Sequence, residues 1–147
     1  MQLRLPCLFA LTLLAACASD EPAPTEKEAT PSIPVQAALP AHMRELSGML
    51  SSTQGYLPAG SEVEVALLVV DDRDRPRQLL ASDRLVATGG AMPFRLVFNP
   101  QSFPNSARVE LRARVIQSGQ LAWRLRPLQI LQAESRALGE LRLERAP

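Results

Sequence analysis

The chain has 147 residues, which is room for one ordinary domain with extensions and for nothing larger. Its 16 Lys and Arg residues nearly balance its 15 Asp and Glu residues, so the formal net charge of +1 argues against a strongly basic nucleic-acid-binding protein and against an acidic disordered tail. The sequence has two cysteines, one histidine and, in Lys27, a single lysine, which leaves few side chains for catalysis.

The first sixteen residues have the pattern of a secretory signal peptide. A short positive start that contains Arg4 precedes an apolar run of twelve residues, 5–16. This run is shorter than the about 20 apolar residues that a membrane-spanning helix needs, and it ends in small side chains, as a processing site requires. We therefore predict that residues 1–16 are removed from the mature protein.

The residues around the expected cleavage site carry a second signal. Leu14, Ala15, Ala16 and Cys17 place an aliphatic residue and two small residues before a cysteine. This pattern resembles the lipobox of bacterial lipoproteins, which implies cleavage between Ala16 and Cys17 and a covalent lipid on the Cys17 thiol. Stable anchoring takes more than one acyl chain, a need that such a lipid meets. An ordinary signal peptide with an incidental cysteine is the alternative.

Residues 17–43 are predicted to comprise the lipidated cysteine and a disordered, Pro-rich tether. Residues 18–43 contain five prolines and neither glycine nor Phe, Tyr or Trp, so the segment is expected to be a semi-rigid, extended linker. His42 lies here, and we interpret it as a tether residue. By the lipoprotein resemblance, Ala18 after the cysteine implies the outer membrane, with the folded part facing the periplasm.

Residues 44–147 are predicted to form an all-β domain. Apolar and polar residues alternate over 62–70 and 108–115, and they alternate again over 121–125 after a turn that contains Gly119. Such alternation is typical of strands with one buried face, and the last two runs indicate a hairpin. The side chains expected to face the core are Val63, Val65, Leu67, Val69, Val109, Leu111, Ala113, Val115, Leu121, Trp123 and Leu125.

Weaker strand signals occupy residues 46–51, 78–87, 94–98 and 138–143. Seven short strands in about 100 residues favour a β-sandwich or a small barrel, and we predict a small β-sandwich of about seven short antiparallel strands. A short helix within 128–138 remains open. Phe94, Phe98, Phe103 and Trp123 are expected in the core, although a groove for an amphipathic partner helix is the alternative.

The order of these segments behind a lipobox and a tether resembles the YbaY/YscW family of bacterial lipoproteins, which includes pilotins of type III secretion systems. The similar stretch runs from about residue 46 to 125. Its five pieces are Leu46–Gly48, Leu57–Val69, Met92–Leu96 with Asn99–Pro100, Leu111–Val115 and Gly119–Leu121. The resemblance implies a compact β-sandwich lipoprotein without an active site.

For the pilotin members, the resemblance implies that the protein binds a C-terminal segment of a secretin, delivers the secretin to the outer membrane and promotes its assembly there. We therefore expect an outer-membrane lipoprotein that acts as a non-catalytic binding and assembly factor, a pilotin-like chaperone for a type III secretion secretin. The alternative is a YbaY-like envelope lipoprotein of structural or surface role without a secretin client.

Arginines at outward positions of two adjacent predicted strands form the main charge pattern, which we call the arginine stripe. From residue 44 onward, 14 arginines stand against 11 acidic residues, a net charge of +3. We predict the stripe as a candidate partner-binding surface for an acidic partner or an anionic lipid or glycan, and a solvated, partly paired sheet face is the alternative. The stripe comprises Arg108, Arg112, Arg114, Arg124 and Arg126.

Enzymatic and metal chemistry find no support. The predicted domain has neither His nor Lys to activate a nucleophile, and its glutamates are expected on a solvent face rather than in a cleft. Asp72, Asp74 and Asp83 have the spacing of calcium-loop positions, but Arg77 stands where that loop needs Gly. We expect no enzyme activity, no metal, no cofactor beyond the lipid on Cys17, no small-molecule substrate and, without interleaved aromatic residues, no nucleic acid.

The lipid anchor can be tested by Cys17→Ser. We expect the variant to keep its fold but to lose the lipid, so that any partner carried to the outer membrane is mislocalised, as membrane fractionation would show. Cys7→Ser is the matched control, because Cys7 belongs to the signal that is removed. A partner that still reached the outer membrane normally with Cys17→Ser would contradict the pilotin hypothesis.

Overall fold

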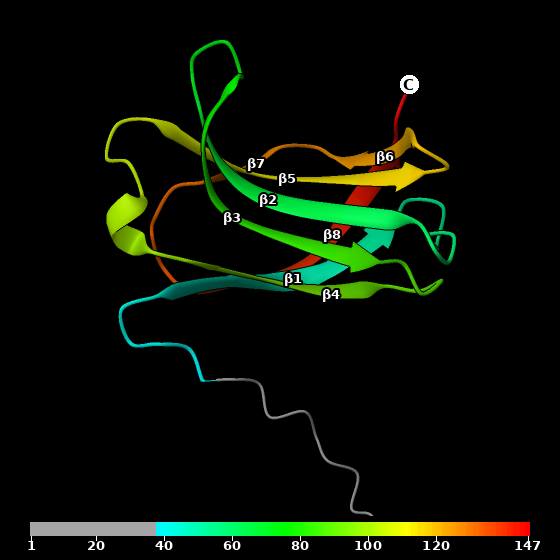
Figure 1. Cartoon of the computed structure of the whole chain (residues 1–147), viewed down its shortest axis with the longest axis horizontal. Coiled ribbons are helices and arrows are strands. Elements are labelled where there is room, and N and C mark those ends of the chain that lie inside the picture. Colours follow the sequence, from blue (N-terminus) through cyan, green and yellow to red (C-terminus); the bar gives the residue numbers. More distant parts are fainter. Residues whose placement is uncertain (1–37) are drawn as a thin grey trace, which may run out of the picture. The chain divides into compact units, whose positions relative to one another are not determined.

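The computed structural model describes residues 38–147, so the predicted signal peptide, the lipobox at Cys17 and most of the predicted tether lie outside the described residues. Eight strands and one short 3-10 helix follow one another in this part of the chain (Figure 1). They are β1 (Arg44–Ser52), β2 (Glu62–Val70), β3 (Pro76–Val86), β4 (Met92–Phe98), η1 (Pro100–Ser102), β5 (Arg108–Gln117), β6 (Gln120–Leu125), β7 (Leu128–Ile130) and β8 (Arg136–Arg145).

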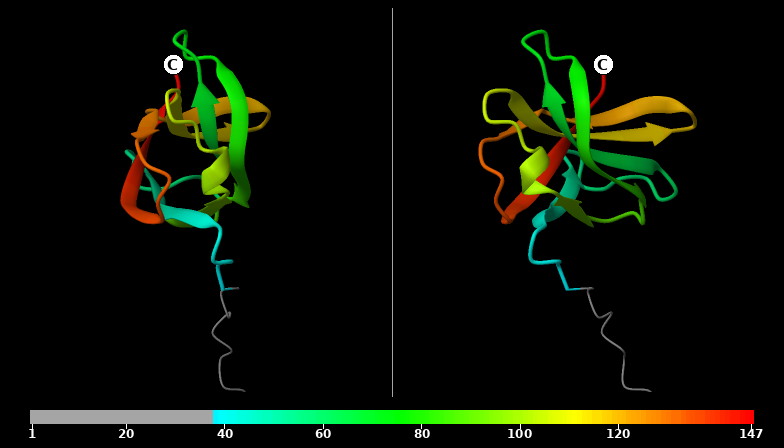
Figure 2. Two further views of the ribbon diagram at one scale, coloured as in Figure 1. Left: turned by 90° about the vertical axis from the view of Figure 1, so that its left-hand side faces the viewer. Right: turned by 60° about the vertical axis from the view of Figure 1, so that its left-hand side comes forward.

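The strands belong to one sheet with the order β3-β2-β5-β6-β8-β1-β4, and β7 pairs with β5. Because β3 and β4, at the two ends of this order, also contact each other, the sheet curves round into a nearly closed, barrel-like form (Figure 2). The all-β fold predicted from the sequence is confirmed. Among residues 38–147, no helix is long and apolar enough to cross a membrane.

One strand pair differs from the predicted antiparallel arrangement. β1 and β8 run parallel, whereas the other pairs are antiparallel. A parallel pair needs a long connection, and here the first and last strands pair, so the whole intervening chain supplies it.

The segment after β6 is a strand rather than the short helix that the sequence left open. Leu128, Gln129 and Ile130 pair with β5 residues Leu111, Glu110 and Val109. Because β5 offers this edge, backbone pairing outweighs the weak helical preference of the segment. The seven predicted strands are all present, and β7 is the additional one.

The predicted inward face of β2 and β5 is buried. Val63, Val65, Leu67 and Val69 alternate with exposed or half-buried residues on β2. Val109, Leu111, Ala113 and Val115 are buried on β5, where the outward-facing Glu110 between the first two is also buried. Phe94, Phe98 and Trp123 are buried as well, and Phe103 packs against Phe98 with ring centroids 6.1 Å apart. These aromatic side chains therefore belong to the core and do not line a groove.

Leu121 departs from the prediction, because it is 51% exposed. Val115 pairs with Trp123, but the next β5 residue, Ile116, pairs with Leu121. Ala122 is thus an extra residue in β6, a β-bulge, and bulges re-aim the side chains beside them. The bulge turns Leu121 from the core to the outer face of the sheet.

We expect Leu111→Ala to lower the free energy of unfolding by about 2–5 kcal/mol, because the fully buried Leu111 side chain packs opposite Leu67 and its loss leaves a cavity. Urea denaturation of the purified chain measures this. The control is Leu131→Ala, a 77% exposed position, with an expected change within about 0.5 kcal/mol. Equal unfolding midpoints for the two variants would contradict the core described above.

Candidate functional site

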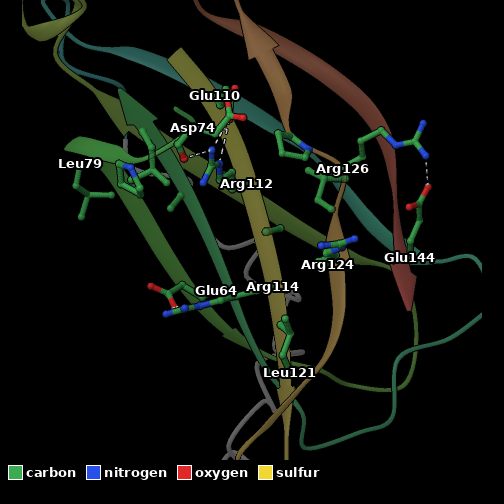
Figure 3. A pocket seen from close by; sticks show the side chains of 16 residues that line it. Glu64, Asp74, Leu79, Glu110, Arg112, Arg114, Leu121, Arg124, Arg126 and Glu144 are labelled. Atoms are coloured by element: carbon green, nitrogen blue, oxygen red, sulfur yellow. Dashed lines mark hydrogen bonds and ion pairs between the residues drawn. The ribbon is translucent and has the colours of Figure 1, made fainter. Parts of the chain in front are cut away.

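A pocket with a volume of about 880 Å³ lies on the outer face of the sheet over β2, β5 and β6 (Figure 3). We call it the outer pocket. Four arginines of the stripe line it, and Arg108 does not. The structure therefore brings together most of the predicted site residues, namely Arg112, Arg114, Arg124 and Arg126.

The outer pocket opens where β5 changes partners. β5 pairs with β6 as far as Arg114 and Arg124, and it pairs with β7 again from Leu111 and Leu128. Between these two paired stretches stands Pro127, which has no N–H to donate to a sheet. Residues 112–113 and 125–127 on the two sides of this interruption all line the pocket.

Apolar side chains supply much of the lining. Ala66 and Leu68 are half-buried on the outward face of β2, and Leu125 lies beside Pro127 at the interruption. Leu79 of β3 and Leu121 of β6 also line the pocket, and they are 55% and 51% exposed (Figure 3). The site thus offers apolar surface to a partner, and the exposed leucines are functional candidates that sequence reasoning missed.

The arginine stripe is largely neutralised within the sheet. Arg114 Nε donates to Glu64 Oε2 at 2.7 Å, across the β2–β5 pair. Arg112 donates to the carboxylate of Glu110 with Nε and Nη2 at 3.0 and 2.8 Å, and Glu110 is only 8% exposed. These contacts are those of the partly paired sheet face that the sequence left as an alternative to a docking surface.

Arg126 and Arg108 also have acidic partners. Arg126 Nη2 lies 3.4 Å from Glu144 Oε1 of β8, and both side chains are well exposed. Arg108 Nη2 binds the carboxylate of Asp74 and donates to the backbone carbonyl of Asp71 at 3.0 Å, which ties β5 to the β2–β3 loop. Arg108 therefore anchors this loop and stands outside the pocket lining.

Arg124 differs from the other arginines of the stripe. It has no hydrogen bond and no ion pair with any of residues 38–147, and Figure 3 shows it between Arg114 and Glu144 without an interaction to either. Its cross-strand neighbours are Arg114 on β5 and Glu144 on β8. Like charges directly opposite each other in a sheet are destabilising, whereas opposite charges are favourable, so Arg124 stands between an unfavourable neighbour, Arg114, and a favourable one, Glu144, without a direct ion pair to either.

The lining as a whole is electrically balanced. The four arginines are matched by four acidic residues, which are Glu64, Asp74, Glu110 and Glu144. A polyanionic ligand would meet these carboxylates as well as the arginines. The role of the arginine stripe as a binding surface stays a prediction. The balance of charges in the pocket lining favours a partner that is not strongly anionic.

The aspartate loop between β2 and β3 is held by arginines. Asp71 accepts hydrogen bonds from the backbone N–H of Arg73 and Arg75 at 2.9 and 3.0 Å and from Arg75 Nε at 3.0 Å. The backbone N–H and the side chain of Arg75 are the main reasons that the pKa of Asp71 lies below its ordinary value of 3.8. Within the described part of the chain, no group of three or more His, Cys, Asp or Glu side chains could hold a metal ion.

Comparison with known proteins identifies the family. Residues 41–137 match the family model described as "Type III secretion system lipoprotein chaperone (YscW)". The match covers more than half of the chain, so the chain belongs to the YscW family, and the resemblance stated from the sequence is confirmed. No curated protein matches the chain.

A solved structure has a similar fold. It is titled "Structure of an alternative pilotin from the type II secretion system of Vibrio cholerae", and the two chains are 17% identical with a TM-score of 0.58. The similarity covers 71% of this chain and 98% of that chain. At this level of identity the similarity shows a shared fold alone.

We expect Asp71→Asn to lower the melting temperature at neutral pH, with a difference from the wild type that shrinks as the pH falls below 3.8. The folded-state pKa of Asp71 is depressed, so its contribution to stability is present above the unfolded pKa and is lost as the pH falls through the folded pKa. Thermal melts across this pH range measure the difference.

Asp72→Asn is the matched control for this prediction, since Asp72 is exposed and has no hydrogen bond or ion pair with other described residues. Only Asp71→Asn should lower the melting temperature at neutral pH. A difference between Asp71→Asn and the wild type that stayed constant with pH would contradict the explanation.

Proposed function

We propose that this chain is an outer-membrane lipoprotein that acts as a pilotin-like chaperone for a secretin of a type III secretion system. The observation that carries the proposal is membership of a family described as type III secretion system lipoprotein chaperones, matched over residues 41–137. The barrel-like fold shared with a type II secretion pilotin is compatible with this role. The family description favours type III secretion over type II.

The lipobox at Cys17 supports the membrane part of the proposal. In this role the lipid on Cys17 anchors the protein to the membrane, because several acyl chains hold a protein there stably. The domain that begins at β1 supplies the binding surface for the secretin. Lipid and domain thus have separate tasks, and the residues between them let the domain work away from its anchor.

A non-catalytic role fits the chemistry of the domain. The single histidine, His42, is exposed and precedes β1, and the domain from Arg44 onward has no lysine. The carboxylates of the outer pocket are largely engaged by arginines, and such pairs position side chains rather than transfer protons. A binding factor needs a complementary surface, and the amphipathic outer pocket provides one.

The proposal is tested by deleting the gene in the source organism and measuring the assembled secretin in the outer-membrane fraction. We expect the amount to fall strongly and to be restored by the wild-type chain. The full-length chain, purified from detergent-solubilised envelopes, should retain the secretin, identified by mass spectrometry, above a tag-only control. Normal secretin assembly without the gene, and no secretin in the capture, would favour the YbaY-like alternative without a secretin client.

A further inference from the structure

The outer pocket has the size and the lining of a site for a peptide segment. Its volume of about 880 Å³ falls within the about 300–1,000 Å³ of ordinary ligand sites. Exposed large apolar side chains that lie together on a surface mark sites of interaction. Leu79 lies opposite half-buried Leu68 and forms such a surface with it at one end of the lining, and Leu121 adds an exposed apolar side chain at the other end (Figure 3).

The charges of the outer pocket define what the segment can carry. Arg112, Arg114 and Arg126 are each paired with a glutamate of the pocket. A surface with several phosphates, or a polyanionic glycan, would have to displace these pairs and approach the four carboxylates of the lining. The pocket therefore disfavours a lipid surface and a polyanion.

Arg124 is the pocket arginine with an unused charge among the described residues (Figure 3). It stands opposite Arg114, whose own charge is already engaged by Glu64. One further carboxylate beside Arg124 would give this side chain the direct ion pair that it lacks among the described residues. Arginine binds a carboxylate with two parallel hydrogen bonds, which gives geometric specificity as well as attraction.

We propose that the outer pocket binds a segment of the client secretin in which aliphatic side chains flank one acidic residue. The carboxylate of that residue pairs with Arg124, and the aliphatic side chains contact Leu79 and Leu121. The inference rests on the function proposed above and names the site and the chemistry of the client segment. It places one new charge contact in a pocket whose other arginines are already paired with glutamates and whose leucines offer apolar surface.

The test uses the full-length, lipidated chain co-expressed with the secretin and purified in detergent. We expect Arg124→Glu to weaken secretin binding about tenfold or more, because a like charge replaces the partner of a desolvated carboxylate. The fold should persist, since the position is exposed and the new side chain, which stands opposite Glu144 on one side, stands opposite Arg114 on the other. Arg136→Glu is the matched control, an exposed arginine outside the pocket with no ion pair to residues 38–147.

The apolar part is tested in the same way. Leu121→Asp should reduce the secretin that is recovered, whereas Val86→Asp should not. Val86 is 66% exposed and does not line the outer pocket, so this control adds the same charge at another exposed aliphatic residue. Circular dichroism of both variants checks that the fold is retained.

A charge swap identifies the partner of Arg124. Acidic residues of the secretin's C-terminal segment are replaced one at a time by lysine and combined with Arg124→Glu, and one replacement should restore binding. Loss of binding that no replacement restores would overturn the assignment of a carboxylate partner. If instead Arg124→Glu lowered binding of the chain to phosphatidylglycerol vesicles and left secretin recovery unchanged, the occupant would be lipid and the inference would be wrong.

Failure of the inference is distinguishable from failure of the proposed function. If the wild type retains the secretin and both Arg124→Glu and Leu121→Asp retain it equally, the function stands and the outer pocket is not its site. If the wild type itself retains no secretin, the proposed function fails and the inference fails with it.

Discussion

Backbone pairing along β5 is the constraint on which both the core and the outer pocket depend. One edge of β5 pairs with β2 from Arg108 to Ile116, while the other edge is divided between β6 and β7. Because side chains alternate along a strand, the same backbone sends Val109, Leu111, Ala113 and Val115 inward and its arginines outward. The interruption at Pro127, which divides the second edge, also opens the pocket. A change that shifted the register of β5 would therefore disturb core and pocket together.

The ion pairs of the outer face serve selectivity more than stability. Exposed pairs contribute only about 0–1 kcal/mol each, so Arg114 with Glu64 and Arg126 with Glu144 add little to folding. These pairs neutralise the arginine charges, so the outer pocket is electrically balanced and has apolar side chains at its edges. Only the pair of Arg112 with Glu110 is more deeply set, since Glu110 is 8% exposed. In the proposed complex Arg124 then recognises a single charge of the partner. Electrostatic complementarity of this kind contributes more to the choice of partner than to the affinity for it.

Most of the fold could be predicted from the sequence, because alternation over 62–70 and 108–115 reports directly which face of a strand is buried. The outward placement of Arg112 and Arg114 followed from the same alternation. Three features could not be predicted in this way. The bulge at Ala122, which exposes Leu121, has no recognisable signal in the sequence. β7 has only three residues, too few to show an alternation of apolar and polar side chains. The pairing of Glu64 with Arg114 depends on which strands become neighbours, and that is a property of the whole sheet.

The pairing of β1 with β8 has a consequence for how the domain comes into being. β8 follows all the other strands in the chain, so two edges, those of β1 and β6, stay open until β8 pairs with them. Open strand edges are templates for pairing with other chains, and contacts between distant parts of a chain form slowly. A product that ended before Arg136 would retain both open edges and be exposed to proteases and to self-association. β8 is thus the strand that closes the sheet between β1 and β6.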